Sequence, residues 1–105
     1  MMTTTNLDTY RAHLKQRLIE SHVSEHVHGG LIEYIATRRP TGGFLEAVLS
    51  NDLREACARA DEQMRPHLYD LVLFLYNYSP GICWSSPELV EAWLAKTEPP
   101  LMVFK

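Results

Sequence analysis

Apolar residues recur along this chain every three or four positions, the spacing that places them on one face of an α-helix. In residues 6–21 charged side chains occupy most of the opposite face. Asn6 precedes this stripe, and its side chain can accept an unpaired N–H at a helix start. The pattern predicts a first helix from Asn6 to about Ser21. Its apolar members are Leu7, Tyr10, Leu14, Leu18 and Ile19.

The same period continues in five further segments, at about residues 24–39, 44–50, 52–62, 66–78 and 86–94. Asn51 is the expected cap of the helix at 52–62, whose inward residues are expected to be Leu53, Ala56, Cys57 and Ala60. Gly29 and Gly30 interrupt the second stripe, and each glycine weakens a helix by about 1 kcal/mol relative to alanine. We therefore expect this helix to start late, near Gly30, or to touch another helix there. Pro40 ends it, because the residue before a proline avoids helical geometry. Ser86 and Pro87 together form a strong start signal for the last helix.

The segment at 66–78 is apolar on nearly every side, as helices in the centre of a protein usually are. No β-hairpin signal occurs anywhere in the chain. The predicted fold is therefore all-α: a single domain, residues 1–105, of five or six short helices packed around 66–78. Residues 1–5 are expected to be flexible. The proline-rich apolar tail, 97–105, is expected either to pack back on the bundle or to contact another chain.

Size and charge narrow the possible functions. The chain has 105 residues, a net charge of -3 and an isoelectric point of about 5.9. An acidic protein of this kind is a poor generic binder of nucleic acid, which needs a basic face. The longest apolar run is far too short to span a bilayer, and no secretion signal is apparent. Cys57 and Cys83 are expected to be free, buried thiols in a reducing cytoplasm.

One loop combines features of an anion site. Arg38 and Arg39 precede Gly42 and Gly43, which open a predicted helix. Free N–H groups and a partial positive charge at a helix start attract anions, and arginines can grip a phosphate. The spacing matches neither a P-loop nor a dinucleotide fingerprint. A plain connecting loop is the alternative interpretation, since arginine also suits a helix C-terminus and glycine suits a tight turn.

Two other groups of side chains are candidate sites. His22, His26 and His28 lie close in sequence, but the expected helix break between them argues against a zinc site, and we expect no metal. Aromatic side chains gather late in the chain and form either a partner-binding patch or packing between the last two helices. These aromatic residues are Tyr76, Tyr78, Trp84 and Trp93.

Residues 40–94 resemble a family of small, uncharacterised proteins encoded by tailed bacteriophages and prophages. The resemblance is carried by Pro-Thr-Gly-Gly-Phe-Leu-Glu-Ala-Val-Leu-Ser-Asn-Asp-Leu at 40–53, Arg-Ala-Asp-Glu at 59–62, Phe-Leu-Tyr-Asn at 74–77, and Cys83-Trp84 followed by Ser86-Pro87-Glu88. Ser85 departs from a glycine common in the family, and the first helix and the tail look like additions. The resemblance implies a phage-borne, cytoplasmic accessory protein. It implies no activity and assigns no functional residue.

These observations favour a non-enzymatic binding protein that needs no cofactor, because no nucleophile–base pair or paired acid set stands out. The resemblance makes a host protein the expected partner, with inhibition of an antiviral defence protein as the expected purpose. A protein that sequesters a small anionic ligand, such as a signalling nucleotide, is one alternative. A structural homo-oligomer that uses the apolar tail is another.

Overall fold

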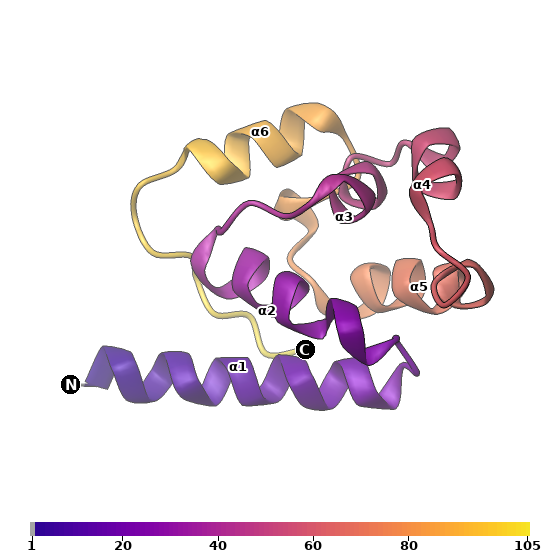
Figure 1. The fold of residues 1–105 in the computed structure, drawn as a ribbon. Coiled ribbons are helices and arrows are strands. Elements are labelled where there is room, and N and C mark those ends of the chain that lie inside the picture. The colour runs from indigo at the N-terminus through magenta and orange to yellow at the C-terminus, as the bar shows by residue number, and fades with distance from the viewer. Residues whose placement is uncertain (1) are drawn as a thin grey trace.

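The computed structural model describes residues 2–105, with side chains from Asn6 onward, and its regular secondary structure is helical (Figure 1). Within this described part no strand forms, which confirms the all-α prediction. The elements in chain order are α1 (Met2–Glu20), η1 (Glu25–Val27), α2 (His28–Thr37), α3 (Gly43–Leu49), α4 (Leu53–Arg59), η2 (Arg65–His67), α5 (Leu68–Tyr78), η3 (Gly81–Cys83) and α6 (Pro87–Ala95).

The first helix is longer than the sequence pattern indicates. It begins at Met2, so Asn6 lies inside the helix and is not its cap. Residues 2–5 belong to this helix, while Met1 lies outside the described residues; the expected flexibility of residues 1–5 stays a prediction. None of the helices in the described chain is both long and apolar enough to cross a membrane.

Helix α2 occupies the centre of the molecule. In Figure 1 it lies against the long rod of α1, with α3 and α6 on its other side. It starts at His28, two residues before Gly30 and so close to the predicted late start, and the close contact given as the alternative is also present: a Cβ at Gly30 would lie 3.1 Å from Leu45 of α3. Its buried residues are His28, Leu31, Ile32, Tyr34, Ile35 and Ala36.

Polar contacts fix α2 against α1. The Arg11 guanidinium donates two hydrogen bonds to the Glu33 carboxylate, at 2.9 and 3.1 Å. Buried His28 lies 2.7 Å from the Val23 carbonyl through Nε2 and 2.8 Å from the Lys15 ammonium through Nδ1. Because an ammonium can only donate, Nδ1 accepts and Nε2 carries the proton. These contacts set how α2 is rotated about its axis, and so which of its residues face the core.

The cap of α6 follows the prediction, whereas α4 departs from it. Ser86 accepts a hydrogen bond from the Leu89 N–H, with Pro87 in the first turn. In α4 the cap is Asp52, not its neighbour Asn51, and the helix ends at Arg59. Ala56 and Ala60 are buried as expected, but Leu53 and Cys57 are exposed, contrary to the prediction, because this short helix buries only a narrow face.

The C-terminal tail folds back on its own chain. Its end lies beside α1 in Figure 1, where the Phe104 ring packs edge-on against Tyr10, with centroids 5.1 Å apart. Arg17 donates to the Lys105 carbonyl at 2.9 Å, and the Lys105 ammonium donates to the Ser79 carbonyl at 3.2 Å. Of the two arrangements left open by the sequence, packing on the bundle is the one observed.

Candidate functional site

The outer side of α5 carries a row of exposed apolar side chains. Tyr69 and Tyr76 are each 74% exposed, and Val72 and Leu73 are each 38% exposed. Their spacing of three, four and seven residues places all four on one side of the helix. We call these four residues the α5 face. The prediction that this segment is buried on nearly every side is therefore wrong.

The α5 face points outward because the opposite side of the helix is occupied. Leu71, Phe74 and Leu75 are buried in the core. Tyr78 packs against Phe74 and lies under the Arg17 guanidinium of α1, 5.0 Å from the ring centroid. A helix with two apolar sides can bury only one of them against a single core.

The sequence is poor in charge from Leu71 of α5 onward. Charged residues make up 22% of the chain, yet residues 71–87 contain none. Exposed Ile82 continues the apolar surface along the chain just beyond α5. Depletion of charge together with enrichment in tyrosine is the composition of the core of a protein–protein interface. The absence of charge over this stretch was visible in the sequence and is the signal that could have located the site.

The four aromatic residues predicted to form a patch do not lie on one surface. Tyr76 belongs to the α5 face, whereas Tyr78 and Trp84 are half-buried against the core. Trp93 is only 2% exposed, and its indole N–H donates to the Tyr34 carbonyl at 2.8 Å. Tyr69, Val72 and Leu73, the other members of the face, were not among the residues singled out.

The predicted anion loop is divided between two places. Arg38 ends α2 in the left-handed region, with φ 62°, and its guanidinium lies 4.1 Å from the Trp93 ring centroid. It donates to the carbonyls of Trp93 and Glu98 at 3.2 and 3.1 Å. It also lines a cavity of about 380 Å³ shared with Lys96, which contains neither glycine.

Gly43 lies instead beneath another arginine, Arg59 of α4, whereas a Cβ built at Gly42 would have nothing within 4 Å. A Cβ at Gly43 would come within 2.7 Å of the Arg59 guanidinium, so this side chain already covers the start of α3. Arg39 is exposed. The start of α3 is thus covered by Arg59 and not by Arg38. The Arg38 side chain instead connects α2 with α6 and the tail.

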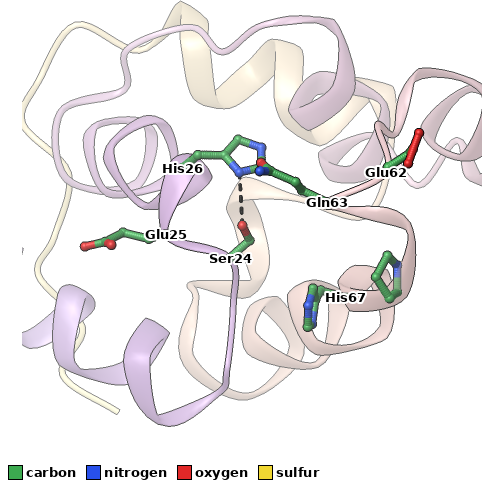
Figure 2. Close-up of a pocket in the computed structure, with 7 residues that line it drawn as sticks. Ser24, Glu25, His26, Glu62, Gln63 and His67 are labelled. Atoms are coloured by element: carbon green, nitrogen blue, oxygen red, sulfur yellow. Dashed lines mark hydrogen bonds between the residues drawn. The ribbon is translucent and has the colours of Figure 1, made fainter.

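The histidines also separate. His28 is buried in the contacts described above, and His22 is exposed beyond the end of α1. His26 lines an open cavity of about 600 Å³ with His67, where its Nδ1 lies 3.0 Å from the Ser24 hydroxyl (Figure 2). Glu25 and Glu62, at the rim of that cavity, point to opposite sides in this view. Across the described residues, no three His, Cys, Asp or Glu side chains are placed to hold a metal ion.

The two thiols differ in environment. Cys57 is exposed, whereas Cys83 is buried, and burial raises the pKa of the Cys83 thiol to about 12. The Tyr34 hydroxyl donates to the Cys83 carbonyl at 2.7 Å, and burial raises the pKa of Tyr34 as well. A thiol with so high a pKa is protonated at neutral pH and is a poor nucleophile. This cluster is therefore part of the packing between α2 and η3.

Comparison of the chain with protein-family models, with curated proteins and with solved structures finds no match. The geometry of the chain itself therefore has to indicate which surface is functional. Among the features described above, the α5 face stands out because it carries four of the nine exposed large hydrophobic side chains of the described residues.

Proposed function

We propose that this protein is a non-enzymatic binding protein and that the α5 face is its working surface. The observation that carries the proposal is the pair of tyrosines, each 74% exposed, which flank Val72 and Leu73 on one side of α5, with Val72, Leu73 and Tyr76 inside the uncharged stretch 71–87. Burying apolar surface contributes roughly 25 cal/mol per Å², so a partner that covers these side chains gains free energy that the monomer leaves unused.

The placement of the face on a helix supports this role. Tyrosine combines a large apolar ring with a hydroxyl, and it is among the residues that dominate binding energy at interfaces. The face belongs to a helix already anchored by Phe74 and Tyr78, so little ordering is needed on binding. A preorganised surface keeps more of its contact energy as affinity.

The resemblance to phage accessory proteins supports a finer proposal about the partner. In that setting the target of the binding protein is a host protein, and an antiviral defence protein of the host cytoplasm is the candidate. The support for this identification is the sequence resemblance alone, whereas the role of the α5 face rests on exposure and composition.

Site-specific photocrosslinking inside living cells tests the proposed surface. A benzophenone amino acid replaces Tyr76 in one variant and exposed Glu91 of α6 in a matched control. We expect a heavier adduct from position 76 and none from position 91. Equal adducts from both positions, or none from position 76, would remove the support for the α5 face.

A second candidate function is the binding of a small anionic ligand. It is favoured by the cavity of about 380 Å³ in which Lys96 joins an Arg38 guanidinium already held in place by Trp93. A ligand that binds only the folded form raises the melting temperature. We expect a shift with a nucleotide that Lys96→Ala abolishes. No shift across a nucleotide panel would eliminate this candidate.

A further inference from the structure

We propose that the α5 face binds a second copy of this chain, with the two α5 helices antiparallel about a twofold axis between Val72 and Leu73. This inference rests on the proposed function, since it takes the α5 face to be a protein-binding surface, but it makes a second copy of the chain, and not a host protein, the occupant of that face. Closed twofold pairing is the commonest form of association between identical chains, and it requires a surface that complements itself.

The α5 face has that self-complementary order. Read in either direction, it presents a tyrosine, two other residues, a branched aliphatic pair, two other residues and a tyrosine. A twofold axis between Val72 and Leu73 therefore places Tyr69 of one copy opposite Tyr76 of the other. It also places Val72 opposite Leu73 of its partner. Four apolar pairs form, and neither α5 face presents a charge at their centre.

Arg65 favours the antiparallel arrangement. Its exposed side chain lies just before α5 and makes no hydrogen bond or ion pair with the described part of its own chain. A cation is unfavourable at the start of its own helix, where the partial charge is positive, and favourable at the end of another helix. Antiparallel pairing brings Arg65 to the C-terminal end of the partner's α5. Parallel pairing would instead place two Arg65 side chains together.

The area available fits a weak dimer. Aromatic side chains bury roughly 150–250 Å² each, so the exposed three-quarters of the two tyrosines supplies roughly 220–370 Å² per copy. Val72, Leu73 and the polar rim bring this toward the roughly 600 Å² per partner typical of transient complexes, below the 800 Å² of standard ones. We therefore expect a dissociation constant of about 10–100 µM.

Sedimentation equilibrium of the purified chain tests this pairing. Between about 1 and 500 µM, spanning the dissociation constant expected from the area, the mean mass should rise from 12.1 kDa toward twice that value. Tyr69→Glu and Tyr76→Lys should each weaken association at least tenfold. Because an acid near a helix start and a base near its end suit the helix dipole, neither change should impair folding. Leu101→Glu, in the tail at a residue 86% exposed, is the matched control and should leave association unchanged.

The double variant Tyr69→Glu/Tyr76→Lys tests the register. Antiparallel pairing places the Glu of one copy opposite the Lys of the other. The double variant should therefore associate more tightly than either single variant. A parallel pair would face like charges and would not recover. A double variant that associates no better than the single ones would overturn the antiparallel arrangement.

Two further outcomes separate this inference from the function on which it rests. In the first, the wild-type chain stays at 12.1 kDa at all concentrations while position 76 still crosslinks to another protein in cells. This result would overturn the pairing with a second copy but would keep the α5 face as a binding surface. Self-association that Tyr69→Glu and Tyr76→Lys do not weaken would place the contact elsewhere and overturn the inference.

Discussion

Helices α2 and α5 are both strongly apolar, yet the molecule uses them differently. Six of the ten residues of α2 are buried, whereas α5 buries three of its eleven. Helix α2 is covered on several sides because α1, α3 and α6 pack around it (Figure 1). Helix α5 lies at the edge, where one side faces the core and the other faces solvent. The apolar sequence of a helix therefore indicates that it packs against other apolar surface. Whether that surface belongs to the same chain depends on the arrangement of the other helices.

The comparison predicts that equal truncations in the two helices have unequal effects on stability. Leu31 of α2 is fully buried, so Leu31→Ala should lower the free energy of unfolding by about 2–5 kcal/mol through lost burial and a cavity. Leu73→Ala on the α5 face is the matched control and should lower it by less than about 1 kcal/mol. Urea denaturation of the two variants measures the difference. Similar losses would mean that the α5 face is structural.

The packing between α2 and η3 should make stability fall in alkaline solution. The pKa of Cys83 is raised from 9.0 to about 12 by burial, so the unfolded chain loses this proton first. Its contribution is complete below pH 9 and is lost as the pH rises toward about 12, amounting to on the order of 2–3 kcal/mol by pH 11. Buried Tyr10 and Tyr34, whose pKa values are also raised, add to this loss.

Unfolding curves between pH 8 and 11 measure this loss, and Cys83→Ala should make the profile shallower. The exposed Cys57 offers the contrast within the same chain. A thiol reagent should modify one cysteine in the native protein and two after denaturation. Rapid reaction of both thiols in the native state would contradict the buried environment of Cys83.

The stability contributed by the C-terminal end of α2 should depend on the contacts of the Arg38 side chain. Arg38→Ala removes the stacking on Trp93 and two hydrogen bonds to carbonyls, and should lower the free energy of unfolding by about 1–2 kcal/mol. Arg38→Gly loses the same contacts but relieves a left-handed backbone that costs a non-glycine residue roughly 1–2 kcal/mol. The glycine variant should therefore be the more stable of the two in thermal denaturation. The reverse order would mean that the side-chain contacts do not explain this arginine.

The smallest effect on stability is expected on the α5 face, together with the largest effect on binding. Tyr76→Ser removes a ring that is mostly in solvent, so the free energy of unfolding should change by less than about 0.5 kcal/mol. The association constant of the same variant should fall at least tenfold. Denaturation and sedimentation of one preparation measure both quantities. A large loss of stability without a loss of association would reverse the roles assigned to α2 and α5.

Much of the fold could be predicted from local sequence. The period of the apolar residues located the helices, and Ser86 with Pro87 marked the start of α6, because these signals act within a few residues. The Asp52 cap was missed by one position. The burial of α5 could not be predicted in the same way, because it depends on whether other elements cover both of its sides. Those elements, such as the tail, α1 and α2, come from distant parts of the chain.

The candidate site was less predictable for the same reason. Arg38 and Gly43 are near neighbours in sequence, yet they face different partners, Trp93 and Arg59, which lie on α6 and α4. The sequence did contain one usable signal, the stretch of residues 71–87 without charge. A buried segment and a binding surface both produce such a stretch, and only the arrangement of the helices distinguishes them.

The most direct test of the central claim is photocrosslinking in cells from position 76 compared with position 91. Both positions are exposed, so they differ in surroundings and not in access to solvent. If the α5 face binds a partner, a discrete adduct forms from position 76 and is lost when Tyr69→Glu is added. Adducts that form equally from both positions, or that survive Tyr69→Glu, would contradict the account.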